Sequence, residues 1–297
     1  MAGAEAAERT EGTELDIRPL TPQIGAEVYG LDLSRPLSPS TVLGIRAALG
    51  RHLVLFFPGQ ELSPDDHAAF ARHFGELTEA HPIMPALDEH PNVLPIDSRH
   101  NKSNFWHSDV TFMSRPPMGS ILYAVLMPDV GGDTLWVSLQ AAYDALAQPV
   151  RDLCDRLIGL HWDPSFAAEI EAAGGCTWAG KRIERLRPVV HPVVRIHPET
   201  GRKGLFVNQN FTTLILDLSP IESDGLLRML FQHCQVPEFS CRYRWQQGTV
   251  AFWDNRATLH YATDDYGDAL RIVHRVTLQG DRPYGPAMPL VGATASA

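Results

Sequence analysis

The stretch 104–112 reads Asn-Phe-Trp-His-Ser-Asp-Val-Thr-Phe and places a histidine and an aspartate two residues apart. In an extended strand, residues i and i+2 point to the same face, so His107 and Asp109 can reach one point in space. A neutral imidazole and a carboxylate on one face make two thirds of the 2-His-1-carboxylate triad that holds non-haem Fe(II). The third ligand must then come from elsewhere in the chain.

The segment 253–260, Trp-Asp-Asn-Arg-Ala-Thr-Leu-His, offers His260 as that ligand, after an aromatic-rich strand and a turn. Eleven residues later, Arg271 opens a segment that alternates like another, adjacent strand. The chain has 13 histidines, so a lone His-X-Asp or a single histidine before Tyr261 has ordinary structural explanations. The combination of the pair, a distant histidine and a spaced arginine is more informative.

These motifs together resemble the taurine dioxygenase family of Fe(II)/2-oxoglutarate-dependent oxygenases, which includes alkylsulfatase-type members. The resemblance rests on 106–112, on Gly-Gly-Asp-Thr-Leu-Trp at 131–136 and on Trp-Asp-Asn-Arg at 253–256, and it runs from about residue 15 to 284. It implies that His107, Asp109 and His260 bind Fe(II), with 2-oxoglutarate and O₂ as co-substrates. Oxidative decarboxylation of 2-oxoglutarate to succinate and CO₂ would then be coupled to hydroxylation of a substrate C–H bond.

The resemblance also assigns residues to the binding of 2-oxoglutarate. Arg271 would bind the distal carboxylate, because a guanidinium fork matches a carboxylate better than an ammonium group does. Thr134 would be the hydroxyl partner of the same carboxylate. The ordinary alternatives are an arginine on a surface strand and a threonine in a β-strand. Trp253 is assigned to the wall of this pocket, with a plain core tryptophan as the alternative.

For the primary substrate, the resemblance to taurine-type members implies an anion held by His81, Arg275 and the backbone N–H of Val110. Arg275 lies four residues after Arg271, so both side chains point to the same face of one strand. Two cationic side chains that point inward, in a protein with a net negative charge, imply two anionic ligands.

Four further residues describe the rest of the substrate pocket. Phe112 and Phe211 are assigned to the alkyl part of the substrate, with plain core aromatics as the alternative. Met84 and Ser103 stand where taurine enzymes carry a tyrosine and an asparagine that help to recognise the amine. The sequence therefore implies a larger, more apolar or differently polar pocket for a small anionic organic molecule.

Several substrates remain open on this basis. The first choice is an alkyl sulfonate such as taurine, with release of sulfite and aldehyde. The second is an alkyl sulfate ester, with release of sulfate by the same hydroxylation. A biosynthetic tailoring hydroxylase of a phosphonate or carboxylate is third, because one fold serves many substrates.

Two readings of a different class also remain. A zinc hydrolase or hydratase accepts the same three ligands, but it needs no clamp such as Arg271 with Thr134. A non-catalytic binding module is disfavoured by the complete triad.

The composition of the chain limits the binding partners and the cellular location that we expect. The chain of 297 residues has a formal charge of −10 and a pI of about 5.7, which argues against nucleic acid and anionic membrane surfaces. With no run of 18 apolar residues and no apolar signal core, the expected location is the cytoplasm. The four cysteines show no CxxC spacing and are interpreted as reduced, mostly buried thiols.

Many short strands with turn punctuation and a few helices predict a mainly β fold with helical cover, a double-stranded β-helix or jelly roll. Residues 1–14 are interpreted as a disordered tail, 15–285 as a single domain and 286–297 as a C-terminal tail. Residues 139–159 are helical by period, and about 160–187 form a lid-like insertion. Relatives suggest a homo-oligomer, either a dimer or a tetramer.

Overall fold

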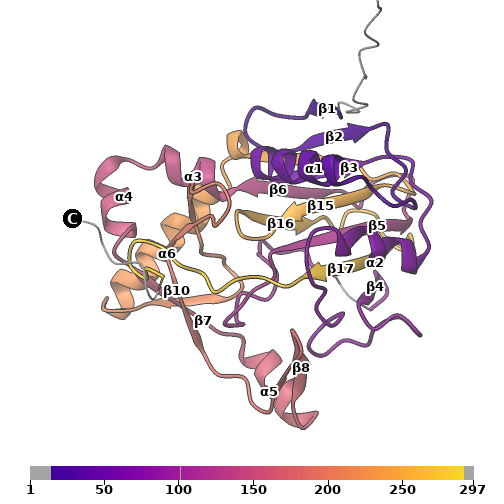
Figure 1. The fold of residues 1–297 in the computed structure, drawn as a ribbon. Helices are drawn as coiled ribbons and strands as arrows, with labels where there is room; N and C mark the ends of the chain where they lie inside the picture. Colours follow the sequence, from indigo (N-terminus) through magenta and orange to yellow (C-terminus); the bar gives the residue numbers. More distant parts are fainter. Residues whose placement is uncertain (1–14, 101, 291–297) are drawn as a thin grey trace, which may run out of the picture.

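The computed structural model describes residues 15–100 and 102–290 (Figure 1), so the expectation for residues 1–14 and for 291–297 lies outside the described residues. The largest sheet has seven strands in the order β1 (Asp16–Pro19), β2 (Ala26–Tyr29), β3 (Val54–Phe57), β15 (Val250–Asp254), β5 (Gly119–Leu126), β17 (Ile272–Leu278) and β4 (Val93–Asp97). A second sheet has the order β14 (Ser240–Tyr243), β6 (Thr134–Ser138) and β16 (Thr258–Ala262).

The smaller ladders are β10 (Val189–Pro192) with β7 (Ile158–His161) and β13 (Thr212–Ile215), β11 (Val194–Ile196) with β12 (Lys203–Leu205), and β8 (Cys176–Trp178) with β9 (Lys181–Ile183). The helices are α1 (Pro39–His52), α2 (Pro64–Arg72), α3 (Leu139–Ala145), α4 (Gln148–Cys154), α5 (Pro164–Ala172), α6 (Pro220–Cys234) and the short 3₁₀ turn Pro237–Phe239. The mainly β fold with helices is thus confirmed, whereas the double-stranded β-helix remains a prediction at this point.

Side-chain alternation along the central strands separates two apolar cores. In β15, Val250 and Phe252 join one core, while Ala251 and Trp253 join the other. Successive residues of a strand point to opposite faces of the sheet, so each strand contributes to both cores. The second core also contains Trp136 of β6, so the seven-stranded sheet and the β14–β6–β16 sheet face each other across it.

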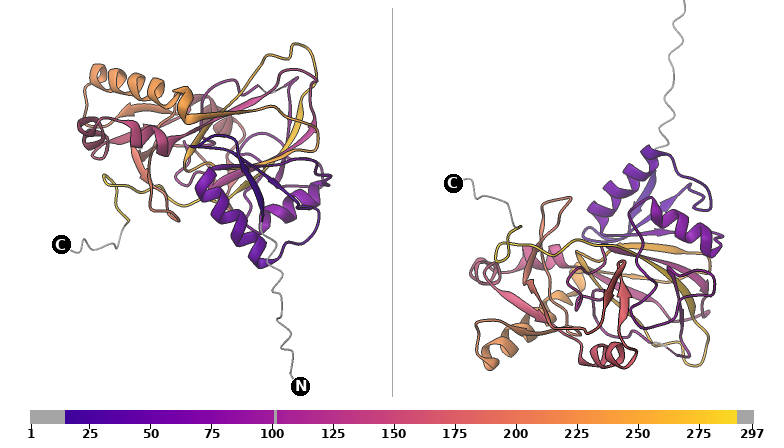
Figure 2. Two further views of the ribbon diagram at one scale, coloured as in Figure 1. Left: turned by 90° about the horizontal axis from the view of Figure 1, so that it is seen from above. Right: turned by 60° about the horizontal axis from the view of Figure 1, so that its bottom comes forward.

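The outer face of the seven-stranded sheet is covered by α1 and α2 (Figures 1 and 2). Ser63 begins α2 with a capping box, in which its side chain accepts the Asp66 N–H and the Asp66 carboxylate accepts the Ser63 N–H. Phe70 and Ala71 of α2 then pack into the first core. The helices therefore shield one face of the sheet and leave the other face to the second sheet.

The expectation of one helical segment over 139–159 is only partly right. Two short helices, α3 and α4, occupy 139–154, and residues 158–161 form strand β7 instead. Pro149 lies in the first turn of α4 and has no N–H to donate to a preceding turn, so a helix can begin there but not pass through. Figure 1 shows α3, α4 and α6 together at one end of the molecule.

The segment 160–187 has its own secondary structure. It contains α5 and the β8–β9 hairpin, which lie together at one edge of the molecule in Figure 1. Ile170 and Trp178 of this segment pack in one apolar cluster with Phe112 and Phe211. The insertion is therefore folded against the residues that the sequence assigned to the substrate.

Two other expectations concern whole-chain properties. All four cysteines are free and buried, as expected. Among residues 15–100 and 102–290, no helix is long and apolar enough to cross a membrane.

Buried histidines predict a loss of stability in mild acid. His67 of α2 is fully buried, and burial lowers its pKa to about 3, although its Nε2 lies 3.1 Å from the Ile121 carbonyl oxygen. Unfolded histidine takes up a proton below about pH 6.5, while folded His67 does not until about pH 3. The free energy of unfolding should therefore be highest above pH 6.5 and fall toward pH 4, by about 1 kcal/mol per pH unit for each such histidine.

Urea unfolding at pH 7.5, 6.0 and 5.0 checks this result. The His67→Gln variant, which can still donate to Ile121, should lose about one histidine's share of the pH slope. His100→Gln changes an exposed histidine and should leave the slope unchanged. A slope in His67→Gln equal to that of the unmodified chain would contradict the assignment.

Candidate active site

The structure gathers His107, Asp109 and His260 into one buried cluster. Their ligand atoms all lie within 4.8 Å of one another. His107 and His260 form an isolated antiparallel bridge, with His107 N–H donating to the His260 carbonyl at 3.1 Å and the reverse bond at 2.8 Å. His260 belongs to β16, so this bridge fixes the backbones of two ligands that lie far apart in sequence.

The local structure around Asp109 differs from the strand that the sequence predicted. His107 makes only the single bridge, and Asp109 and Val110 lie in a turn. The side chain of Asn255 replaces a strand partner, because its Oδ1 accepts the Asp109 N–H at 2.7 Å and its Nδ2 donates to the Asp109 carbonyl at 3.1 Å. Val110 follows with φ of 51°, which is rare for a β-branched residue and marks a backbone held by its surroundings.

Asn255 was not among the residues proposed from sequence, although it lies in the quoted motif 253–256. Replacing it with alanine should weaken binding of a divalent metal by about 10- to 100-fold, the usual cost of losing support behind a ligand. The free energy of unfolding should fall by about 1–3 kcal/mol, because a buried N–H loses its acceptor. Anaerobic Fe(II) titration and urea unfolding measure the two effects.

Asn208→Ala is the matched control. Asn208 is also buried, accepts the Phe211 N–H at 2.8 Å and donates to Thr111 Oγ1 at 2.9 Å, but it does not contact Asp109. This variant should lose similar stability and keep its metal affinity. Equal metal affinities for Asn255→Ala and Asn208→Ala would show that Asn255 has only a general structural role.

The protonation states suit metal binding. His107 Nδ1 lies 2.9 Å from the Phe105 carbonyl oxygen, so it carries the proton and leaves the Nε2 lone pair toward Asp109, 3.7 Å from Oδ1. Burial lowers the pKa of His107, and burial followed by repulsion from His107 lowers the pKa of His260 to about 3. Both imidazoles are therefore neutral at pH 7.

Asp109 is ionised in this surrounding. Burial by itself would raise its pKa, but Arg275 and the two histidines bring it below its ordinary value. Ser120 Oγ donates to Asp109 Oδ2 at 2.7 Å, while Oδ1 faces His260 Nε2 at 3.8 Å. Two neutral imidazoles and one carboxylate, all buried, form a donor set that fits Fe(II), although His260 Nδ1 has no partner among the described residues.

A first cavity adjoins the triad and is called here the Arg271 cavity. Arg271, Thr134 and Trp253 all line it, together with His107 and His260. Arg271 Nε donates to the Gly132 carbonyl at 3.1 Å, and its Nη2 lies 3.4 Å from Thr134 Oγ1. The sequence-based grouping of Arg271 with Thr134 is thus reproduced in space.

The charge of Arg271 is unusual for its burial. The residue is 7% exposed, and no carboxylate of the described residues lies within ion-pair distance of it. Burial lowers its pKa, as expected for a cation without a compensating anion. Since buried charges are ordinarily paired, this guanidinium is suited to an anionic ligand, and the distal carboxylate of a keto acid fits.

Trp253 belongs to the core and also lines the Arg271 cavity, and its contact with 2-oxoglutarate stays a prediction. It is 2% exposed within the second core, and its ring lies 4.9 Å from that of His260 at the cavity wall. Trp136 and Lys102 are among the cavity residues that were not assigned to the site from the sequence, and Lys102 Nζ lies 2.7 Å from Asp264 Oδ1. Trp136 closes the quoted motif 131–136, whereas spacing gave no signal for Lys102, because Lys102 and Asp264 meet only through the fold.

A second cavity, which shares His107 and Arg275 with the first, is called the His81 cavity and has a volume of about 320 Å³. It brings together all seven residues assigned to the primary substrate: His81, Met84, Ser103, Val110, Phe112, Phe211 and Arg275. Ile96 and Phe166 also line it. The volume and the mostly apolar walls are those of a small-molecule site.

His81 presents a hydrogen-bond donor in this cavity. Its Nδ1 accepts the N–H groups of Ile83 at 3.2 Å and Met84 at 3.1 Å, so the proton of the neutral ring is on Nε2. Burial, and then Arg275, lowers the pKa of His81 to about 3. The Val110 N–H makes no hydrogen bond within the described part of the chain.

Arg275 has a partner that the sequence did not predict. Its Nη1 donates to Asp109 Oδ1 at 2.9 Å, and its Nε is buried without a hydrogen-bond partner among the described residues. Arg275 lines both cavities, as the shared face with Arg271 predicted. The expectation that β16 and the arginine strand are adjacent was wrong, because β16 and β17 lie in different sheets.

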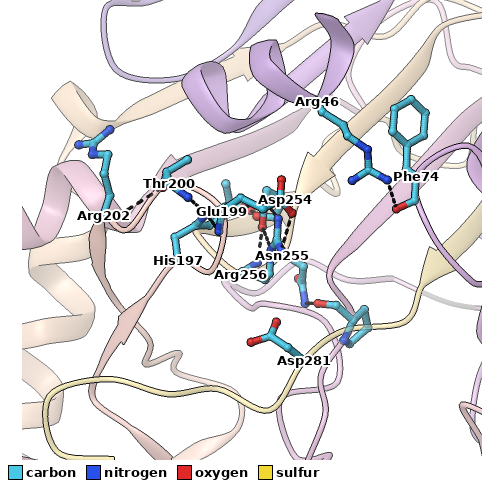
Figure 3. A network of polar contacts seen from close by, with 12 residues as sticks. Arg46, Phe74, His197, Glu199, Thr200, Arg202, Asp254, Asn255, Arg256 and Asp281 are labelled. Carbon is cyan, nitrogen blue, oxygen red and sulfur yellow. Dashed lines mark hydrogen bonds and ion pairs between the residues drawn. The ribbon is translucent and has the colours of Figure 1, made fainter. Parts of the chain in front are cut away.

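A polar network lies behind Asn255 (Figure 3). Asp254 accepts two hydrogen bonds from the Arg256 guanidinium, at 2.9 and 2.6 Å, and lies 2.9 Å from His197 Nε2. Arg256 also pairs with Glu199 at 2.9 Å. This network fixes the turn between β15 and β16, which carries Asn255 on one side and leads to His260 on the other.

Two facing sheets with a buried His-Asp-His cluster, an uncompensated arginine and a neighbouring substrate-sized cavity define a class: metal-dependent, keto-acid-using oxygenases. Residues 16–277 match the model of the taurine catabolism dioxygenase TauD, TfdA family. The chain belongs to this family, and it is a 2-oxoglutarate-dependent dioxygenase.

Individual relatives cover nearly the whole chain. It is 40% identical to an α-ketoglutarate-dependent sulfate ester dioxygenase of Pseudomonas putida, over 96% of each chain. It is 38% identical to an alkylsulfatase of Acinetobacter baylyi, over 90% of this chain and 86% of the relative. The crystal structure of a taurine dioxygenase from Burkholderia xenovorans superposes with a TM-score of 0.81 and 42% identity, over 92% of each chain.

Proposed function

We propose that this protein is an Fe(II)- and 2-oxoglutarate-dependent dioxygenase that cleaves alkyl sulfate esters. Hydroxylation of the carbon that bears the sulfate would release sulfate and leave an aldehyde. One observation carries the class of a small anion with an alkyl part: His81 and Arg275, which can bind an anion, stand beside the triad in a cavity with apolar side chains in its walls. The likeness to the sulfate ester dioxygenase and the alkylsulfatase supports the same class.

The chain's own residues would divide the work between the two cavities. Arg271 and Thr134 hold the distal carboxylate of 2-oxoglutarate, and Trp253 forms the wall that separates this ligand from the core. His81 Nε2–H, Arg275 and the Val110 N–H hold the sulfate group, and Phe112 and Phe211 pack against its alkyl chain. Fe(II) on His107, Asp109 and His260, with 2-oxoglutarate and O₂, supplies the oxidation of one C–H bond.

The products follow from ordinary bond changes after that oxidation. The new hydroxyl and the sulfate share one carbon, so the O–H proton leaves, the C=O bond forms and the C–O bond to sulfate breaks. Aldehyde, sulfate, succinate and CO₂ are formed from one O₂. No side chain has to act as a strong acid, because sulfate is a good leaving group.

The remaining details of the fold belong to the same proposal. The two facing sheets correspond to the jelly roll of this family, a rigid frame for ligands that come from distant segments. The insertion at 160–187 acts as a lid-like wall of the His81 cavity, since Phe166 of α5 lines that cavity.

An alkyl sulfonate is the second candidate, and the likeness to the Burkholderia xenovorans taurine dioxygenase favours it. The same hydroxylation would then release sulfite. Met84 and Ser103 stand at the positions that would recognise an amine, and neither side chain is charged, which makes a plain alkyl tail the better match.

A product assay tests the proposal. The protein is loaded anaerobically with Fe(II) and 2-oxoglutarate and then given O₂ with hexyl sulfate, octyl sulfate, hexanesulfonate or taurine. We expect sulfate and succinate in equal amounts with the sulfate esters and none without 2-oxoglutarate. Sulfite from the sulfonates alone would favour the second candidate. Sulfate release without 2-oxoglutarate or O₂ would indicate a hydrolase instead.

A further inference from the structure

The His81 cavity carries a negative charge that the reaction does not use. Glu169 of α5 lines this cavity and is exposed, whereas Arg275 at the triad is only 8% exposed. The cavity therefore has a buried end beside the triad, with the hydrogen-bond donors of His81 and Arg275, and an acidic residue at its solvent side. Between them the walls are apolar, and Met84, Phe112 and Phe211 contribute to them.

The position of Glu169 relative to His81 follows from Phe166, which lies on the same helix as Glu169. Its ring lies 5.6 Å from the His81 ring and 5.2 Å from the Phe112 ring. Glu169 is three residues further along the same helix, so its Cβ lies roughly 5–6 Å from that of Phe166 on the same face. The Glu169 carboxylate therefore lies on the same wall of the cavity as Phe166, where an alkyl chain that extends from His81 along this wall can reach it.

The charge of Glu169 is not compensated nearby. No lysine, arginine or histidine of the described residues lies within ion-pair distance of it. Lys102 also lines the cavity, but its Nζ is bound to Asp264 Oδ1 at 2.7 Å, so its charge is already paired. An end group of a bound chain that reaches this position would therefore meet a net negative potential.

We propose that Glu169 is a specificity-determining residue, which favours substrates whose end remote from the anionic head is uncharged or cationic and rejects a second anion there. The inference rests on the proposed function, because it takes the anionic head to lie at His81 and Arg275. It adds a selection rule for the other end of the substrate.

The test compares substrates that differ only at the remote end. The sulfate esters are hexyl sulfate, 6-aminohexyl sulfate and 6-sulfooxyhexanoate. The corresponding sulfonates are assayed in parallel, so that the preference for the tail can be measured whichever head group the enzyme accepts. The measured quantity is the ratio of kcat/KM for the uncharged tail to that for the carboxylated tail. It is determined for the unmodified holoenzyme and for Glu169→Gln and Glu169→Lys.

The unmodified enzyme should prefer the uncharged and the amino tail over the carboxylated one. Glu169→Gln should lower the ratio of kcat/KM for the uncharged tail to that for the carboxylated tail by roughly three- to ten-fold. This is the effect expected of one charge in a partly solvated site. Glu169→Lys should lower this ratio further and should also lower kcat/KM for the amino tail. Glu171→Gln removes an exposed carboxylate from the same helix without touching the cavity and should leave the ratio unchanged.

Failure of the inference and failure of the proposed function give different results. If substrates are turned over but both Glu169 variants keep the ratio within two-fold of the unmodified enzyme, Glu169 does not select the tail. If neither sulfates nor sulfonates are turned over by the unmodified enzyme, the proposed function itself is wrong, and the inference is overturned with it.

Discussion

Replacing Asp109 by alanine is expected to lower kcat/KM by at least about 1,000-fold, because the cluster loses its only anionic ligand. Two neutral histidines, His107 and His260, cannot neutralise a divalent cation in a buried site. The loss should be measured as 2-oxoglutarate-dependent O₂ uptake and succinate formation with a turned-over sulfate ester or sulfonate.

A second variant separates loss of the ligand from loss of structure. Asp109→Ala also leaves Arg275, which donates to Asp109 Oδ1 at 2.9 Å, without its anion in a buried site. Asp109→Asn keeps the shape of the side chain and removes only the charge, so it should lose nearly as much activity while circular dichroism stays unchanged. Asp224→Asn, an exposed aspartate on α6 paired with Arg228, is the control and should keep full activity. More than a tenth of the activity in folded Asp109→Asn would contradict the ligand assignment.

Replacing Arg271 by alanine should raise the KM for 2-oxoglutarate by about 100-fold, since removing one partner of a buried charge pair costs several kcal/mol. Arg271→Lys should recover part of this loss. It restores a charge but not the fork that meets both oxygens of a carboxylate. Anaerobic titration with 2-oxoglutarate measures the affinity directly, and kcat at saturating 2-oxoglutarate should change far less than KM.

Arg275→Ala is the informative comparison, because Arg275 lines the same cavity but faces the triad. It should raise the KM for the primary substrate by about ten-fold or more and change the KM for 2-oxoglutarate by less than about three-fold. Equal damage to both affinities in the two variants would contradict the division of roles between Arg271 and Arg275.

Much of the site could be predicted from local spacing and motif. His107 and Asp109 are two residues apart, and Arg271 and Arg275 are four apart, so the periodicity of a strand predicts that the members of each pair share one face. Such spacings can be read from the sequence because each involves only a few neighbouring residues.

The secondary structure of the ligand segment was predicted less well. The sequence suggested a strand through Asp109, but only His107 makes a bridge, and the chain turns at Asp109 and Val110. The ligands still converge, because the amide of Asn255 supplies to Asp109 the two hydrogen bonds that a strand neighbour would have supplied. A side chain from 146 residues away leaves no trace in local periodicity.

The sequence by itself predicted the three ligands through the motifs shared with the family, and it predicted the strand alternation and the two inward arginines through short spacings. Only the tertiary structure decided which charges are paired: Arg275 lies beside Asp109 and Lys102 beside Asp264, whereas Arg271 and Glu169 have no oppositely charged partner in the described part of the chain. Electrostatic pairing depends on distances of a few ångströms between segments far apart in the chain, and those distances are set by the packing of the two sheets and the insertion.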